Sequence, residues 1–248
     1  MMPTAIAASD GPAVANPTIT VRDIDGAERE SSLGNASEHV LRTAQPWRTF
    51  RWYYGQRHYS GTYATATMSQ SRIYESRLEL ARLLLADFDP DVTHMVSQPF
   101  LMRAVVDSKT RRHVPDFLLF GENKVTVVDV KPRSHLDDPT VVATFAWVRR
   151  VVENRGWFFE IASEPERVLL NNVRFLAGFR HPKGISAEIL LDLRDRALVG
   201  RTLAESTALI DAPAPCVRAA LFHMLWRHEL SVDLTRRLSS QTTLEVAK

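Results

Sequence analysis

Three polar side chains near the middle of the chain have the types and spacing that metal-assisted hydrolysis requires. Asp129 and Lys131 end the run Val125-Thr-Val-Val-Asp-Val-Lys131, and Asp116 lies on the apolar segment before it. Alternate residues of a strand share a face, so Asp129 and Lys131 point the same way, about 6.6 Å apart along the strand. Two carboxylates can hold a hard cation such as Mg²⁺, which lowers the pKa of bound water and neutralises charge on a phosphate. The lysine can orient or help deprotonate the attacking water, or stabilise the developing negative charge.

A hairpin is needed to bring the two carboxylates together. The sequence predicts strands at Val114–Phe120 and Val125–Val130, joined by a turn at Gly121–Asn123. Pairing of these strands brings Asp116 beside Asp129.

A helix expected from Ser71 to about Asp87 offers a further acidic group. Glu75 and Glu79 are four residues apart and therefore share one helical face. Either could reach the metal. Glu79 is the preferred candidate because it follows Leu78 and lies deeper in the apolar pattern.

The remaining pattern predicts an α/β fold with the order α-β-β-β-α-β-α, a restriction-endonuclease-like mixed sheet flanked by helices. The other expected elements are a strand at Val92–Val106 bent at Pro99, a helix at Pro139–Asn154, a strand at Trp157–Ala162 and a helix from Pro165 to about Phe179. Residues 46–68 suggest strands joined by a tight turn around Gly55 and Gly61. These elements define an expected nuclease domain at residues 46–181.

Two further segments flank this domain. Residues 1–45 lack sustained periodicity and are expected to be largely disordered, with a short strand at Thr18–Asp23. Residues 182–248 are expected to form a small winged-helix-like domain that binds DNA or a partner. Its expected elements are helices at Ser186–Ala197, Leu203–Ile210 and Ala214–His228 and strands at Leu230–Leu234 and Thr242–Val246.

Composition narrows the class of protein. The chain has 248 residues and a net charge of +2, and its middle segment, residues 46–181, carries 19 basic and 15 acidic residues. The single cysteine, Cys216, excludes an internal disulfide and a cysteine-rich zinc site. No apolar run reaches the length of a membrane helix, so no membrane partner is expected. A reducing bacterial cytoplasm, with association to the nucleoid, is the expected compartment.

Taken together, the acidic and basic residues resemble a known pattern. Pro115-Asp116 followed by Asp129-Val-Lys131 resembles the PD-(D/E)xK nuclease superfamily. More narrowly, the chain resembles the TnsA endonuclease family of heteromeric transposases. That likeness rests on Glu75-Ser-Arg-Leu-Glu79, Asp87-Phe-Asp-Pro90, Gln98-Pro99, Val114-Pro-Asp-Phe117 and Val128-Asp-Val-Lys-Pro132.

The resemblance implies an Mg²⁺-dependent DNA endonuclease, with Mn²⁺ able to substitute, that nicks the 5′ strands at transposon ends. Its implied partners are double-stranded DNA, a DDE-type transposase and an ATPase regulator. By position, Glu79, Asp116 and Asp129 would be metal ligands and Lys131 the catalytic lysine. Some family members carry Gln where Asp129 stands, and Asp is the more usual superfamily residue.

Secondary candidates surround this set. Gln98 matches a family position and is expected near the site, with Glu75 as another secondary candidate. Arg111, Arg112 and Arg133 flank the expected cleft and suit phosphate contacts, because arginine binds phosphate in a forked geometry. His113 would face away from Asp116 in a regular strand.

Two other functions fit the same residues. A stand-alone restriction or anti-phage nuclease of the superfamily would cut DNA without transposon ends. A non-catalytic DNA-binding adaptor could retain the nuclease fold, although the intact acid-acid-lysine set argues against it. The tail carries 9 basic and 8 acidic residues, which is not the strongly basic surface expected of a DNA reader.

Overall fold

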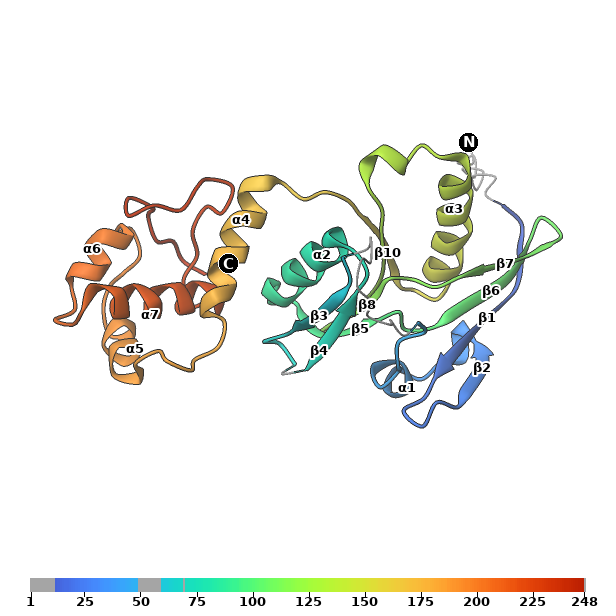
Figure 1. The fold of residues 1–248 in the computed structure, drawn as a ribbon, viewed down its shortest axis with the longest axis horizontal. Helices are drawn as coiled ribbons and strands as arrows, with labels where there is room; N and C mark the ends of the chain where they lie inside the picture. Colours follow the sequence, from blue (N-terminus) through green and yellow to red (C-terminus); the bar gives the residue numbers. More distant parts are fainter. Residues whose placement is uncertain (1–11, 49–58, 69, 248) are drawn as a thin grey trace, which may run out of the picture. The chain divides into compact units, whose positions relative to one another are not determined.

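In a computed structural model, residues 12–48, 59–68 and 70–247 are described, and the chain divides into two compact units (Figure 1). Unit 1 comprises Met1–Thr62, Arg72–Leu78 and His94–Ser163. Unit 2 comprises Tyr63–Ser71, Glu79–Thr93 and Glu164–Lys248. Each is described by itself below. None of the described helices is long and apolar enough to cross a membrane.

Two four-stranded sheets form most of unit 1. The first sheet has the order β2-β1-β6-β7, and its strands are β1 (Val14–Arg22), β2 (Glu28–Ser32), β6 (Leu101–Val106) and β7 (Lys109–His113). The second sheet has the order β10-β9-β8-β5, and its strands are β5 (Val92–Ser97), β8 (Phe117–Gly121), β9 (Val125–Val130) and β10 (Phe158–Ala162). It is mixed, because β10 runs parallel to β9 while β8 runs antiparallel to it.

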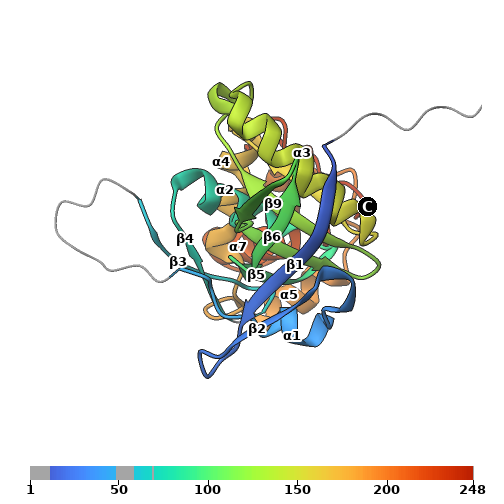
Figure 2. The ribbon, with the colours of Figure 1, turned by 90° about the vertical axis from the view of Figure 1, so that its right-hand side faces the viewer.

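Helix α3 (Pro139–Asn154) closes the core of unit 1, where it packs against β10 and against β1. Figure 2 shows α3 beside β1. Asp138 caps its first turn by accepting hydrogen bonds from Thr140 and Val141, and Pro139 occupies a favourable first-turn position. Its apolar face contributes Trp147 and Val148 to a core shared with both sheets. This mixed α/β arrangement is the restriction-endonuclease-like fold that the sequence predicts.

The expectation of a disordered segment at residues 1–45 is wrong for the part that the structure describes. β1 pairs with both β2 and β6, and Ile19 is fully buried. A short helix, α1 (Glu38–Arg42), follows. The alternating Thr18-Ile-Thr-Val21 is the signal for this strand, and it extends over more residues than the sequence indicates.

The first long helix begins later than predicted. Residues Ser71–Tyr74 form β4, which pairs with β3 (Gly61–Ala64), and α2 covers Arg77–Phe88. Gly61 permits this hairpin, because a Cβ at that position would overlap the Tyr74 ring. Of the strands expected in residues 46–68, β3 is observed, and the part at residues 49–58 lies outside the described residues.

The predicted strand Val92–Val106 is two strands, β5 and β6, that belong to different sheets. The chain changes sheet at Gln98-Pro99, where Gln98 has a positive φ of 47°. β7 was not predicted, because its exposed sequence Lys-Thr-Arg-Arg-His lacks an apolar alternation.

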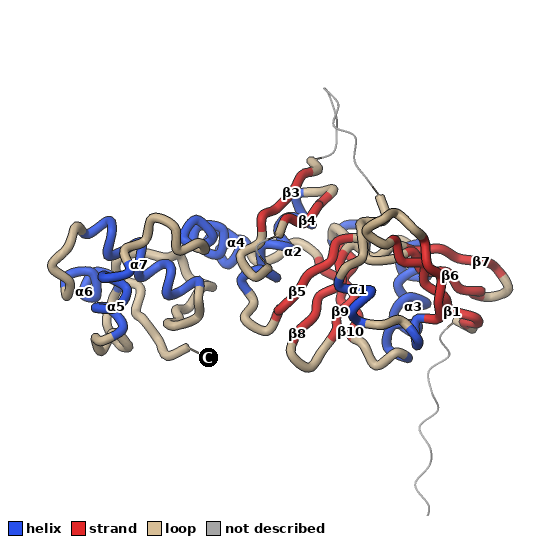
Figure 3. Tube along the Cα trace, turned by 90° about the horizontal axis from the view of Figure 1, so that it is seen from below, coloured by secondary structure: helices blue, strands red, loops and turns tan. Residues whose placement is uncertain are grey.

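Unit 2 is organised by helices (Figure 3, blue). These are α4 (Arg167–Leu176), α5 (Ala187–Arg194), α6 (Leu203–Ala208) and α7 (Ala214–Trp226), together with most of α2. Leu84 of α2 and Val173 of α4 share a core with Leu221 of α7. The two units therefore do not meet at the domain boundary that the sequence predicts, between residues 181 and 182.

The predicted C-terminal hairpin is not formed as a pair of strands in the described part of the tail. The β pairing of residues 230–247 is limited to two isolated bridges, one between Ser231 and Glu245 and one between Thr243 and Thr202. A winged-helix assignment is therefore not confirmed, although the three predicted helices are present.

Candidate nuclease site

The β8–β9 hairpin brings Asp116 and Asp129 to the same end of its ladder. Phe117 pairs with Val128 at this end of the ladder, Asp116 directly precedes Phe117, and Asp129 directly follows Val128. The Val130 backbone N–H donates a hydrogen bond to Asp116 Oδ2 over 2.6 Å. The adjacency predicted from the hairpin is therefore present.

Asp129 is the most buried polar residue of this group, with 3% of its surface exposed. It continues the strand face of Val125 and Val127, both of which lie in the core of unit 1. A buried carboxylate is costly unless it is hydrogen-bonded. His113 provides that partner, since its Nε2 lies 2.8 Å from each Asp129 carboxylate oxygen.

His113 was expected to point away from the site, and that prediction is wrong. It assumed one regular strand from Val114 to Phe120, but β7 ends at His113 and β8 begins only at Phe117. The irregular residues between the two strands, including Pro115, break the alternation of faces. The Trp147 ring meets the His113 ring edge-on, with 6.3 Å between the ring centroids.

Lys131 directly follows β9, and its backbone remains fixed to the neighbouring strand. Its N–H donates to Ala162 O over 2.9 Å, and its carbonyl accepts a hydrogen bond from Ser163 Oγ over 2.7 Å. The side chain is half-buried. Because Lys131 is two residues beyond Asp129 on this extended backbone, alternation places both side chains on one face.

Gln98 joins the acidic group of Glu75 to the strand end that carries Asp116. The Gln98 backbone N–H donates to Asp116 O over 2.8 Å, and its side-chain Nε2 donates to Glu75 Oε1 over 2.6 Å. Its Oε1 accepts the Arg48 N–H over 2.8 Å. The Arg48 side chain also pairs with Glu75, with 3.8 Å between Arg48 Nη1 and Glu75 Oε2. The two secondary candidates, Glu75 and Gln98, thus contact each other in unit 1.

Glu79 lies in the first turn of α2 and is half-buried. It belongs to unit 2, whereas Asp116 and Asp129 belong to unit 1. Its approach to the two aspartates therefore stays a prediction.

The three arginine candidates are exposed side chains in unit 1. Arg111 and Arg112 lie on β7, and Arg133 begins a 3₁₀ turn, Arg133–His135, directly after the Lys131-Pro132 segment. Their exposure suits contact with a polyanion, and the contact itself stays a prediction.

The carboxylates at the site are few but sufficient for a hard divalent cation such as Mg²⁺. Over residues 12–48, 59–68 and 70–247, no three or more His, Cys, Asp or Glu side chains are arranged to hold a metal ion. Mg²⁺ commonly uses only one or two protein carboxylates and completes its octahedron with water and substrate phosphate oxygens. The pair Asp116 and Asp129 meets that requirement.

The mixed sheet carries Asp116, Asp129 and Lys131 at one end of the β8–β9 hairpin, which is the arrangement that the sequence predicts for a metal-dependent nuclease site. Residues 89–164 match the family model described as TnsA-like endonuclease N terminal. The chain therefore contains a TnsA-like nuclease domain. A comparison with curated proteins found no match.

Proposed function

We propose that this protein is the TnsA-like endonuclease subunit of a heteromeric transposase and cuts the 5′ strands at transposon ends. The observation that carries the proposal is that Asp116 accepts a hydrogen bond from the Val130 backbone, next to Asp129 and just before Lys131, inside the segment that matches the TnsA-like model. A DDE-type transposase and an ATPase regulator are its proposed partners, and double-stranded DNA is its substrate.

Asp116, Asp129 and Glu79 are the proposed ligands of Mg²⁺ or Mn²⁺, with Glu75 as the alternative acid from the same chain segment. The bound ion supplies Lewis-acid polarisation of the phosphate and a more acidic water. Lys131 positions or deprotonates the attacking water, or stabilises charge on the phosphate, from the face that it shares with Asp129. Arg111, Arg112 and Arg133 contact the DNA backbone in the proposed complex.

The test uses the full chain and a plasmid that carries the two ends of its own element, with and without the co-expressed transposase partner. We expect Mg²⁺-dependent cutting whose positions map to the 5′ strands at these ends. Lys131→Ala should abolish cutting while duplex binding, measured by fluorescence anisotropy, persists. Glu122→Ala is the matched control, because Glu122 is exposed in the turn of the same hairpin.

Each negative result has a distinct meaning. Cutting by Lys131→Ala at the wild-type rate would overturn the site assignment. Cutting of plasmids that lack the ends, without a partner, would support a stand-alone nuclease instead. Duplex binding without cutting under every metal and partner condition would support a non-catalytic adaptor.

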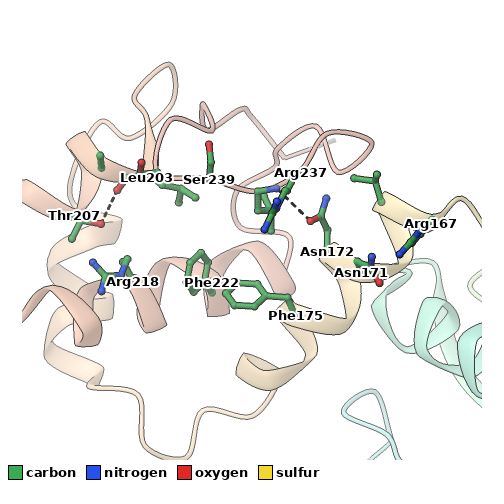
Figure 4. A pocket seen from close by; sticks show the side chains of 14 residues that line it. Arg167, Asn171, Asn172, Phe175, Leu203, Thr207, Arg218, Phe222, Arg237 and Ser239 are labelled. Atoms are coloured by element: carbon green, nitrogen blue, oxygen red, sulfur yellow. Dashed lines mark hydrogen bonds between the residues drawn. The ribbon is translucent and has the colours of Figure 1, made fainter.

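A groove of about 1050 Å³ supports a partner-binding role for unit 2 (Figure 4). Its apolar lining includes Phe175 and Phe222, whose rings contact each other, and Arg167, Arg218 and Arg237 also line it. The full lining contains no Asp or Glu. We propose that the groove receives an acidic protein segment with an apolar anchor, because duplex DNA offers no apolar side chain to fill such a groove.

A Glu-rich peptide with a central Phe is a suitable probe for this groove. We expect it to bind the full chain and to lose affinity in Arg218→Ala, while Arg174→Ala behaves as wild type. Arg174 is the matched control, because it is exposed on α4 and does not line the groove. Failure of the peptide to bind, together with loss of duplex binding in Arg218→Ala, would assign the groove to DNA.

A further inference from the structure

We propose that His113 is a positioning residue for the metal site and that it holds the Asp129 carboxylate in its ligating orientation. The inference rests on the proposed function, because it treats Asp129 as a metal ligand. His113 comes from β7 of the first sheet, whereas Asp129 ends β9 of the second. The contact therefore ties the metal-binding strand to the other sheet of unit 1.

The hydrogen-bond geometry sets the direction of the contact. An ionised carboxylate can only accept hydrogen bonds, so His113 Nε2 carries the proton that is shared by the two Asp129 oxygens, each 2.8 Å away. A protonated Nε2 that faces Asp129 cannot itself be a metal ligand. An ionised carboxylate has about four lone-pair sites, so a cation can bind Asp129 while this hydrogen bond remains.

Burial makes the orientation specific. The side chains of His113 and Asp129 are 17% and 4% exposed. Water therefore has little access to replace the N–H donor if His113 loses it. The Trp147 ring meets the imidazole at an interplanar angle of 88°, which restricts rotation of the His113 ring. Groups that orient a ligand in this way commonly change metal affinity about 10–100-fold when they are removed.

Two substitutions separate the hydrogen bond from the packing. His113→Phe keeps an aromatic ring against Trp147 and removes the N–H donor. His113→Gln restores a donor, because the Gln Nε2 is separated from Cβ by the same number of bonds as the His Nε2. Thr110→Ala is the matched control, since Thr110 is exposed on the same strand and has no place in the proposed site.

The experiment measures Mn²⁺ binding to the full chain by electron paramagnetic resonance, together with the Mg²⁺ concentration that gives half-maximal cutting. We expect His113→Phe to raise the Mn²⁺ dissociation constant and this Mg²⁺ concentration about tenfold. His113→Gln should recover most of the affinity, and Thr110→Ala should match the wild type. The thermal unfolding midpoint of each variant reports whether the fold is intact, and His113→Met replaces His113→Phe if the latter does not fold.

The outcomes distinguish this inference from the function on which it rests. If the wild type does not bind Mn²⁺, or if Asp129→Ala binds it equally well, the proposed metal site is wrong. If Asp129→Ala loses Mn²⁺ while the donor-free His113 variant binds with wild-type affinity, the metal site stands and the role of His113 is overturned.

Discussion

Gln98 offers a test of the geometry at the site, because its backbone and its side chain can be perturbed separately. Its φ of 47° lies in the left-handed region. Its side chain donates to Glu75 over 2.6 Å and accepts the Arg48 N–H over 2.8 Å. Gln98→Ala removes both hydrogen bonds and keeps a Cβ. Gln98→Gly removes both hydrogen bonds and also the steric cost that a Cβ has in a left-handed backbone.

The expected magnitudes follow from these contacts. A neutral hydrogen bond contributes about 1 kcal/mol net and one to a charged group about 1.5–3 kcal/mol, so Gln98→Ala should lower the free energy of unfolding by about 3 kcal/mol. A left-handed conformation costs a non-glycine residue about 1–2 kcal/mol. Glycine loses about 0.5–1 kcal/mol more than alanine in chain entropy on folding. Gln98→Gly should therefore be more stable than Gln98→Ala, by about 0.8 kcal/mol at the middle of these ranges.

Urea unfolding followed by tryptophan fluorescence measures this difference. The signal reports mainly on unit 1, because Trp226 is the one tryptophan of the sequence outside the residue ranges of that unit. Glu122→Ala again serves as the surface control. A Gln98→Ala variant as stable as Gln98→Gly would refute the left-handed backbone at this position. A loss well below 1 kcal/mol in both variants would refute the two side-chain hydrogen bonds.

Three further predictions concern stability in unit 2. Burial, with Asp87 beside it, raises the pKa of Tyr63 above its ordinary value of 10.0. The stabilisation should be complete below pH 10.0 and fall as the pH rises further, and melting curves of Tyr63→Phe should lack this alkaline loss. The hydrogen-bonded Arg194 guanidinium lowers the pKa of Glu229 below 4.5. The stabilisation that ionised Glu229 contributes should be present above pH 4.5 and decline below it. Acid titration of the stability of Glu229→Gln should show a smaller decline than that of the wild type. Thr202→Ala removes the capping box of α6 and should cost about 1 kcal/mol in urea unfolding, whereas Thr207→Ala tests whether any threonine loss in this helix has the same effect.

The central hairpin and α3 could be predicted because their signals are local. β9 and α3 have the bounds expected from the sequence, Val125–Val130 and Pro139–Asn154. The valine run and the Asp-Pro cap each specify one structure without help from distant residues. The short turn between β8 and β9 is what brings Asp116 and Asp129 to the same end of the hairpin.

The parts that were missed depend on distant contacts. β1 is ordered because it pairs with β6, whose residues lie more than 80 positions further along the chain. Periodicity within residues 1–45 cannot report that pairing. β7 is an exposed strand held by β6, and the side-chain direction of His113 depends on where β7 stops. The contact between His113 and Asp129 therefore required the tertiary structure.

In the C-terminal tail, by contrast, the sequence predicts two strands that the structure does not form among its described residues. The apolar runs Leu230–Leu234 and Thr242–Val246 alternate as strands should, yet they form isolated bridges and pack into the helical core of unit 2. Leu230, Val232 and Leu244 are buried there. Alternation indicated burial correctly but did not distinguish a strand from an extended segment.

The most direct test of the central claim is a Mg²⁺ titration of DNA cutting by the wild type, Asp116→Asn and Asp129→Asn. Asparagine keeps the size of each side chain and removes the negative charge that a cation requires. We predict that both variants fold and bind duplex DNA as the wild type does, and that neither cuts at any Mg²⁺ concentration that supports the wild type. Cutting by either variant at the wild-type rate and metal dependence would contradict a metal site formed by these two carboxylates.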